Sequence, residues 1–553
     1  MDEHEQTPSS ALRIALTISG AVSLGAYEGG ALAALLVALK KLGERLPDRV
    51  VVDAIAGASA GSMTAVLTAK GLLTHADPVQ IMYTAWVEAA SLGRMKAAGA
   101  TEAPLSMAQI RTTAEQLLGE LAATGDGAPQ RTPIRVEFAL GALRGLNYTF
   151  RRLGRPPIAA TSYMDWYRCE FSAASDPATY CDAISPAFAS GAHALAFPAE
   201  LLVREIDRSK YERNGVNNFP KTGALWYTDG GTIDNQPLGR ALDMTDELDR
   251  SLDGCRLHLV IIPDPSIPAA AKENDWADPA TPPKWLPTVA RAGKMAMTQT
   301  LYDDLRRAEK RNSRLEWSAE LSAVLSEHLH PDAASALARL IARFDAERVD
   351  LGAHSKGAVP REGEVDGDAQ QASSRAALKD LVREAMAAAT GLQGKQPVAI
   401  DAVSPLLLAP RDKAELKRLL SGDRYGHFFG FLHPQLRSRD FALGYRCMLA
   451  WLDDSGRGLR TYGIPDDHVR AAVQAAQARY EKKWEDEPGF TVGGLPRGSW
   501  PDVRHVMTRT SRLLVGGLAA WSYRRRKRAA RNGVKRVAGK LRKAAARVPR
   551  PWR

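Results

Sequence analysis

Residues 50–69 read VVVDAIAGASAGSMTAVLTA, and this stretch decides the fold. Val50 to Ala56 is a short apolar run rich in valine, which is typical of a buried strand. From about Gly61 to Ala69 the pattern is helical. The segment between them, Gly57-Ala58-Ser59-Ala60-Gly61, matches GxSxG, the pattern that places a nucleophilic serine on a tight strand-to-helix turn. Outside this context, the same five residues would be an ordinary turn of small residues.

The chemistry explains why small residues surround Ser59. The serine hydroxyl must project above the sheet, and Gly57 and Gly61 allow the turn to form without side-chain collisions. The helix that follows directs its first backbone amides, that of Ala60 among them, at the place where negative charge would develop. We therefore predict that Ser59 is a catalytic nucleophile.

The same arrangement occurs earlier in the chain. Ala11 to Ser19 reads as a buried strand, and Leu32, Leu35, Leu36 and Leu39 recur at the spacing of a helix. The loop between them, Gly20 to Gly25, lacks both the full GxGxxG pattern and a GK[ST] pair, so a nucleotide-binding loop is a poor interpretation. Two strand–turn–helix units in succession predict an α/β fold with a mainly parallel sheet.

A second candidate catalytic group is Asp229, in the sequence Asp229-Gly230-Gly231. It directly follows the apolar run Ala224 to Tyr227, so we expect it at the carboxyl end of a strand, where the active sites of parallel sheets gather. On its own this tripeptide also describes a plain turn.

The remaining patterns predict the domain organisation. Further strands are expected at 136–140, 167–173, 225–228 and 257–262, with a helix at about 106–123, and the α/β unit is expected to end after Pro263. We predict an acyl hydrolase domain at 11–284, a mainly helical extension at 285–503 with a linker near 352–374, and a basic tail at 504–553.

Together, the loop, GxSxG and DGG resemble the patatin-like phospholipase family, in which they follow in this order. The resemblance extends over roughly residues 11 to 265, and Asn235-Gln236-Pro237, Ser190-Gly191 and Phe197-Pro198 match further segments of it. Residues 428–452, with Arg437, Asp440 and Gly444, resemble a C-terminal stretch of larger bacterial members. The resemblance implies a three-layer fold and a lipid acyl hydrolase of the phospholipase A or lysophospholipase type, with Ser59 and Asp229 acting as a dyad without histidine.

The loop departs from the family's usual GGGxRG. Aligning on Gly25-Ala26-Tyr27 places Gly20, Ala21 and Val22 on the three glycines and Leu24 on the arginine. Backbone amides need no particular side chain, so we expect those of Gly20, Ala21, Val22 and Ala60 to form an oxyanion hole. No metal or cofactor is required. By chain order, His258 and His354 are candidates for the third member of a conventional triad, but neither lies in a recognisable motif.

Composition and charge indicate the class of protein and the cellular compartment in which we expect it. Hydrophobic residues make up 45% and charged residues 25%, which is typical of a globular protein that can bury a sizeable core. Four cysteines without a CxxC pair, an acidic N-terminus and no apolar run of about 20 residues predict a cytoplasmic protein without disulfides, structural zinc or a transmembrane helix. The net charge of +11 comes from the tail: 524–553 holds 14 Lys/Arg and no Asp/Glu, which leaves −3 for the remainder.

The tail suggests a partner. Apolar residues at 513–521 and an amphipathic basic pattern after them are typical of peripheral binding to an anionic membrane, here its inner face. A solvated tail and a nucleic-acid-binding tail are alternatives, and little else favours nucleic acid. Two non-catalytic functions also remain open, a silent patatin-like scaffold and an adaptor acting through the tail. The sequence does not predict an oligomeric state.

Overall fold

A computed structural model provides the structure of the chain. It describes residues 11–96, 103–119, 124–152, 155–249, 255–264, 285–328, 397–408 and 427–484, together with a few single residues. The predicted linker near 352–374, His354 and nearly all of the tail at 504–553 lie outside the described residues. Cys169, Cys181 and Cys447 are free thiols.

Eight strands form one mixed sheet, which confirms the predicted α/β class. In spatial order they are β5 (Glu200–Val203), β6 (Ala224–Asp229), β3 (Ile134–Arg152), β2 (Val50–Gly57), β1 (Leu12–Ile18), β7 (Cys255–Ile261) and β8 (Ala399–Val403), and β4 (Arg155–Phe171) pairs with β3. The run from β3 to β8 is parallel, whereas β4, β5 and β6 join by antiparallel pairing.

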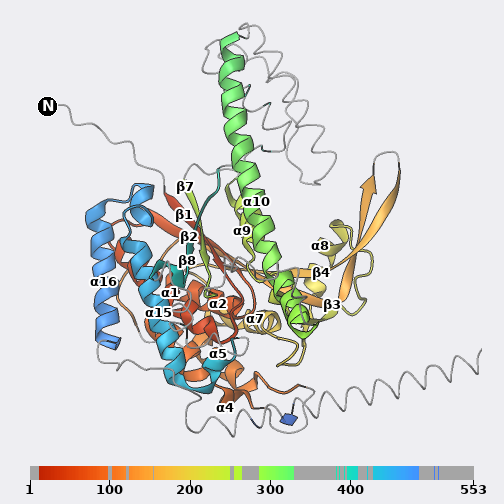
Figure 1. Cartoon of the computed structure of the whole chain (residues 1–553), viewed down its shortest axis with the longest axis horizontal. Coiled ribbons are helices and arrows are strands. Elements are labelled where there is room, and N and C mark those ends of the chain that lie inside the picture. Colours follow the sequence, from red (N-terminus) through yellow and green to blue (C-terminus); the bar gives the residue numbers. More distant parts are fainter. Residues whose placement is uncertain are drawn as a thin grey trace, which may run out of the picture.

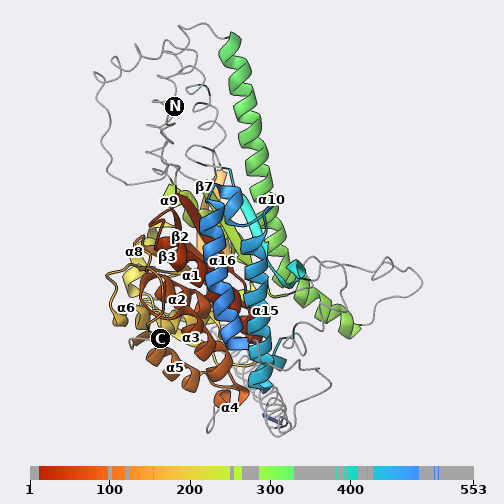
Figure 2. The same cartoon turned by 90° about the vertical axis from the view of Figure 1, so that its left-hand side faces the viewer.

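Helices cover the sheet in two layers. One layer holds α1 (Gly25–Gly43) and α2 (Ala60–Leu73), with α15 (Pro434–Asp453) and α16 (Asp466–Trp484) packed outside α1 (Figures 1 and 2). The other layer holds α9 (Leu238–Leu248) and the long helix α10 (Trp285–His328). Side chains alternate along a strand, so Ile14 and Leu16 of β1 pack in the core with α1, whereas Ala15 packs against α9.

The remaining helical elements of the described residues are short. They are η1 (Val22–Leu24), α3 (Pro78–Tyr83), η2 (Thr84–Ala89), α4 (Leu92–Met95), α5 (Ala108–Gly119), α6 (Pro177–Asp182), α7 (Ile184–Ser190), η3 (Glu205–Asp207), α8 (Arg208–Arg213), η4 (Gly230–Thr232), η7 (Pro405–Leu407), η8 (Phe429–Leu432) and η9 (Leu459–Tyr462).

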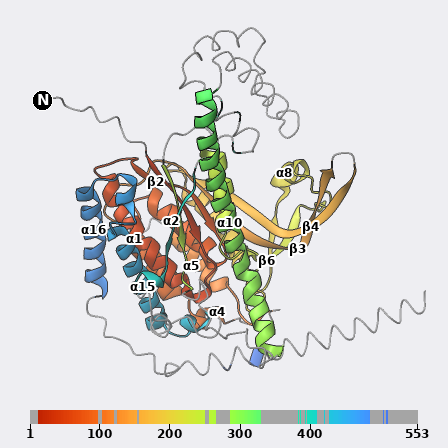
Figure 3. The ribbon, with the colours of Figure 1, turned by 45° about the horizontal axis from the view of Figure 1, so that its top comes forward.

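Two strands are much longer than predicted. The expected strands at 136–140 and 167–173 belong to β3 and β4, which pair from Ile134 opposite Phe171 out to Arg152 opposite Arg155. They form an antiparallel arm that projects beyond β6 (Figure 3). The β3–β4 ladder shifts register between Gly141 and Leu146, which disturbs the alternation of side chains after Gly141. The apolar pattern in the sequence therefore predicted only the part of each strand that lies in the buried sheet.

Elements on both sides of the boundary predicted after Pro263 and at residue 284 contact each other. Strand β8 pairs in parallel with β7, and α15 lies directly against α1. Gly30 of α1 and Gly444 of α15 make this crossing close, because a Cβ on either would lie within 3.0 Å of backbone carbonyl oxygen on the other helix. The predicted extension at 285–503 therefore supplies an edge strand and a supporting helix to the first unit.

Helix α1 meets the length and apolarity of a membrane span. The segment Val22–Gly43 passes that test, but 89% of its most apolar window is buried inside the protein. Here these features reflect a central core helix, which contacts α2, α3, α15 and α16.

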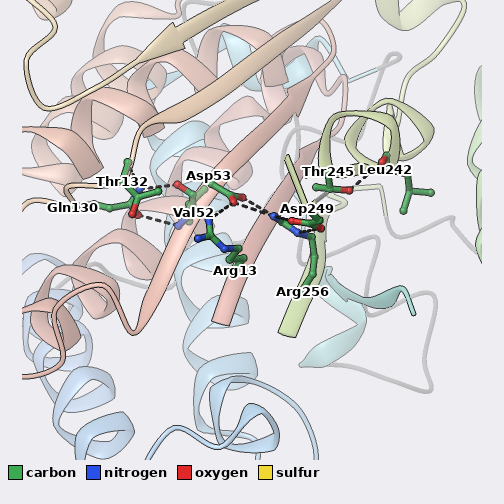
Figure 4. A network of polar contacts seen from close by, with 9 residues as sticks. All are labelled: Arg13, Val52, Asp53, Gln130, Thr132, Leu242, Thr245, Asp249 and Arg256. Carbon is green, nitrogen blue, oxygen red and sulfur yellow. Dashed lines mark hydrogen bonds and ion pairs between the residues drawn. The ribbon is translucent and has the colours of Figure 1, made fainter. Parts of the chain in front are cut away.

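A buried ion network joins β1, β2 and β7 (Figure 4). Asp53 is the extra residue where β2 shifts register against β1, and its carboxylate binds Arg13 of β1 and Arg256 of β7. Arg256 also binds Asp249, just after α9. On the other edge of β2, the side-chain amide of Gln130 exchanges two hydrogen bonds with the backbone of Val52, as a neighbouring strand would.

Candidate active site

Ser59 lies on the strained turn that its motif predicts. Its φ of 52° and ψ of −120° place it in a region that non-glycine residues rarely adopt, directly between β2 and α2. A Cβ on Gly57 would meet the backbone of Gly61, and a Cβ on Gly61 would meet the carbonyl oxygens of Ile18 and Ser19, all within 3.0 Å. Both glycines of GxSxG are therefore required by close backbone packing around the serine.

The structure brings Ser59 and Asp229 together. The Ser59 hydroxyl donates a hydrogen bond to Asp229 Oδ2 at 3.0 Å, and the other carboxylate oxygen accepts the Gly231 amide at 2.7 Å. Asp229 ends β6 and is only 3% exposed. Burial raises its pKa to about 6, against the opposing effect of the two hydrogen bonds. The aspartate is thus ionised at neutral pH and has a higher proton affinity than an ordinary carboxylate.

Ser190, at the end of α7, holds the turn from behind. Its hydroxyl oxygen accepts the backbone amide of Ser59 at 2.9 Å and lies 2.7 Å from the hydroxyl of Ser62. All three side chains are buried. The sequence analysis noted Ser190-Gly191 only as a matching segment, and no local pattern indicates this contact.

The loop beside the dyad provides fewer free amides than predicted. The Gly20 amide donates to the carbonyl oxygen of Asn235 at 2.8 Å, and the Asn235 side chain donates back to the Gly20 carbonyl at 3.0 Å. Gly20 is therefore not available as an oxyanion donor. Within the described part of the chain, the amides of Ala21, Val22 and Ala60 have no hydrogen-bond acceptor.

Val22 has a backbone conformation that glycine adopts more easily than valine. Its φ of 54° is left-handed, a conformation that costs a β-branched residue about 1–3 kcal/mol. Leu24, at the position of the family's arginine, is fully buried in the core. The loop thus keeps the conformation that the glycines would permit, although it replaces the arginine with an apolar core residue.

The other motif glycines serve close packing. A Cβ on Gly230 would meet the backbone of Ala139, and one on Gly25 would meet the Trp86 ring, each within 3.0 Å. One on Gly231 would approach the side chains of Asn235 and Asp229. These residues fix the loops on either side of Ser59 and carry no reactive group.

An apolar pocket opens beside Ser59. Its walls come from α2, η2, α5, α7 and η8, and Val22 and Ser59 also line it. Almost all of the lining is aliphatic or aromatic, including Met63, Leu67, Trp86, Met107, Ile110, Leu117, Phe188, Phe197, Phe428 and Phe431. The polar residues that line it are Ser59, Thr113 and His193. A pocket of this composition suits a hydrocarbon chain whose polar end lies at Ser59.

Of the two histidine candidates, the structure describes only His258, and it does not contact the dyad. In the parallel ladder of β1 and β7, His258 pairs with Ala15, three residues before the end of β1 that leads to the site. Burial, with Arg256 and Arg311 nearby, lowers the pKa of His258 to about 3. His193 lines the pocket instead, and burial lowers its pKa as well. His193 could not be identified from the sequence, because it lies in no motif of its own.

In the part of the chain that the structure describes, no group of three or more His, Cys, Asp or Glu side chains is arranged to hold a metal ion. Residues 16–242 match the family model of patatin-like phospholipases. A comparison with curated proteins gave no match. The family match supports lipid acyl hydrolysis at the level of the family, and both Ser59 and Asp229 lie within the matched residues.

Proposed function

Residues 16–242 of this chain form a patatin-like phospholipase domain, and from that premise we propose that Ser59 and Asp229 hydrolyse acyl esters of lipids. The observation that carries the proposal is the hydrogen bond of 3.0 Å from the Ser59 hydroxyl to Asp229 Oδ2, because Ser59 also lines an apolar pocket. An activated serine beside a hydrocarbon-binding surface is what a lipid esterase requires.

The reaction takes place in two steps. Asp229 accepts the hydroxyl proton as Ser59 attacks the ester carbonyl carbon, and it returns the proton to the departing alcohol oxygen, which leaves an acyl-enzyme. Asp229 then accepts a proton from water, which attacks the acyl carbon and releases the fatty acid, and Ser59 is protonated again. The carboxylate is within direct reach of the serine, so no intervening histidine is needed.

The developing oxyanion needs donors that are free before substrate arrives. The Ala60 amide, at the start of α2, and those of Ala21 and Val22 meet this condition, whereas Gly20 does not. Removing one such donor in related chemistry costs about 3–4 kcal/mol of transition-state stabilisation. The helix α2 adds its positive end at the same place.

We propose a phospholipase A or lysophospholipase type of substrate, because the pocket that Ser59 lines is otherwise lined almost entirely by apolar side chains, which suit an acyl chain. Peripheral contact with an anionic membrane on its cytoplasmic face, through 513–553, is a further proposal that rests on sequence alone.

The test is hydrolysis of p-nitrophenyl esters and of mixed phosphatidylcholine and phosphatidylglycerol vesicles by the full chain. We expect Ser59→Ala and Asp229→Asn to lose activity on both substrates while retaining their circular dichroism spectra. His193→Gln tests for a triad, and we expect it to keep most of the ester turnover. Full activity of Ser59→Ala would overturn the proposal, and loss of activity in His193→Gln equal to that in Asp229→Asn would replace the dyad with a triad.

A further inference from the structure

Residues 427–432, just before α15, lie against the loop that precedes α1. The backbone amide of Ser23 donates to the carbonyl oxygen of His427 at 3.1 Å, and the Ser23 hydroxyl donates to the same oxygen. The Gly430 amide in turn donates to the Ser23 hydroxyl oxygen at 3.2 Å. We call residues 427–432 the aromatic strap; it lies outside the residues that match the family model.

The strap is anchored on its other side by a buried arginine. Arg437 of α15 is 1% exposed, and its guanidinium donates to the carbonyl oxygen of Val87 at 2.7 and 2.9 Å and to that of Gly430 at 3.0 Å. Val87 belongs to η2, a wall of the apolar pocket. One side chain therefore joins the strap to a pocket wall, and burial lowers the pKa of Arg437 to about 10, where it still carries its charge at neutral pH.

The strap also forms part of the pocket itself. Phe428 and Phe431 line the pocket together with Ser59, and their rings meet edge to face at 5.9 Å. Phe428 makes a similar contact with His193 at 5.8 Å. These two aromatic rings are pocket-lining residues that lie outside the residues matched by the family model.

From these contacts we propose that the aromatic strap is a specificity element of the active site. Phe428 and Phe431 limit the length of the acyl chain that the pocket accepts, and Ser23 is a positioning residue that holds the oxyanion loop through His427 and Gly430. The inference rests on the proposed function. It assigns to the C-terminal region a direct part in choosing the substrate, beyond its support of the fold.

The hydrogen bonds between Ser23 and the strap lie next to a strained residue of the oxyanion loop. Val22, the residue before it, has the left-handed φ of 54° and a free amide. A strained residue keeps its conformation only when its surroundings over-determine it. The hydrogen bonds of Ser23 to the strap are the contacts next to Val22 that do so, and their loss would let the loop relax away from the conformation that presents its amides.

The chain-length test uses p-nitrophenyl esters from butanoate to hexadecanoate and the full chain. We expect Phe431→Ala and Phe428→Ala to shift the preferred ester by at least two to four carbons toward longer chains, because each removes a ring from the wall. Gln435→Ala, an exposed residue of α15 close to the strap, is the matched control and should keep the original profile. An unchanged profile in both phenylalanine variants, with normal circular dichroism, would overturn the specificity assignment.

The positioning role of Ser23 is tested by measuring hydrolysis of the preferred ester by the Ser23→Ala variant. We expect kcat to fall about 10-fold with KM changed less than 2-fold, because the apolar wall remains while the oxyanion loop loses its support. A fall confined to KM, or no change, would overturn the positioning assignment. The Ser59→Ala variant distinguishes failure of the proposed function from failure of the strap proposal. If Ser59→Ala stays active, the proposed hydrolase function is wrong. If Ser59→Ala is inactive while the strap variants behave like the unaltered chain, only the proposed role of the strap is wrong.

Discussion

The backbone amide of Ser59 is held by the hydroxyl of Ser190, from a helix 131 residues further along the chain, at 2.9 Å. Ser59 needs such a partner because its left-handed φ turns the amide away from the regular bonds of both β2 and α2. The nucleophile is therefore oriented at two points, its hydroxyl by Asp229 and its backbone by Ser190.

We predict that Ser190→Ala weakens the turn more than Ser62→Ala does. The first change leaves a buried amide without an acceptor, which costs about 1–3 kcal/mol, and we expect kcat to fall about 10-fold with KM nearly constant. Ser62→Ala removes the Ser62–Ser190 contact but keeps the Ser59 amide satisfied, so it serves as the control. Steady-state kinetics on a soluble ester, with thermal melting of each variant, measures both effects. Equal kcat values for the two variants would show that Ser190 does not position the nucleophile.

The raised pKa of Asp229 predicts a pH profile. A general base must be ionised, so kcat/KM should fall about 10-fold per pH unit below a pH of about 6 and level off above it. A histidine base would produce a similar limb, and for that reason the profile should be recorded for His193→Gln as well. We expect the same limb in that variant, and its disappearance there would assign the titration to His193.

Asp229 also predicts a pH dependence of stability. Its pKa in the folded chain, about 6, lies above the ordinary value of 3.8, so ionisation is harder in the folded state. Protonated Asp229 therefore contributes to the free energy of unfolding, and this contribution is fully present below about pH 4. It is lost as the pH rises to about 6, and for two pKa units it amounts to about 3 kcal/mol. We expect the melting temperature of Asp229→Asn to decline less over this interval than that of the unaltered chain. Parallel declines would contradict a buried, destabilising carboxylate.

The parts of the site that could be predicted are those encoded locally. GxSxG specifies a strand, a turn and a helix within a dozen residues, and Ser59 lies where the pattern places it. Asp229 could be placed at a strand end for the same reason. Because carboxyl ends of strands meet at one edge, the two motifs together anticipate a single site even though 170 residues separate them.

What could not be predicted depends on contacts between distant segments. The strand β8 is only five residues long, and it was not predicted because its sequence does not reveal its pairing with β7. Nothing near Gly20 indicates that the Asn235 carbonyl would occupy its amide, which removes it from the predicted oxyanion hole. Valine propensity argues against the left-handed φ of Val22, and tertiary contacts overrule it.

The ion network around Asp53 yields a stability prediction. Asp53→Asn leaves the buried guanidinium of Arg256 without its carboxylate between β2 and β7, and breaking one partner of a buried pair costs about 3–5 kcal/mol. The control is Glu309→Gln, whose side chain is 65% exposed and pairs with Arg306, which is 52% exposed, because such an exposed pair contributes about 0–1 kcal/mol. Urea unfolding compares the two. A difference between the variants below about 1 kcal/mol would mean that solvent or Asp249 compensates Arg256.

The close crossing of α1 and α15 makes the role of the C-terminal region in the fold testable. A methyl group on Gly444 would press on the backbone of Tyr27, two residues beyond the start of α1 and three after Leu24. Overpacking a rigid contact costs about 1–3 kcal/mol, so we expect Gly444→Ala to lower the unfolding midpoint.

The matched control for that crossing is Gly93→Ala, at an exposed helical position where a Cβ meets no atom within 4 Å, and alanine there should add about 0.5–1 kcal/mol. Because α1 begins directly after the oxyanion loop, Gly444→Ala should also reduce ester turnover beyond what the fraction of unfolded protein explains. If both glycine variants gain stability alike, α15 does not bear on α1 in solution, and the support that this region gives to the active site would have to come from the aromatic strap alone.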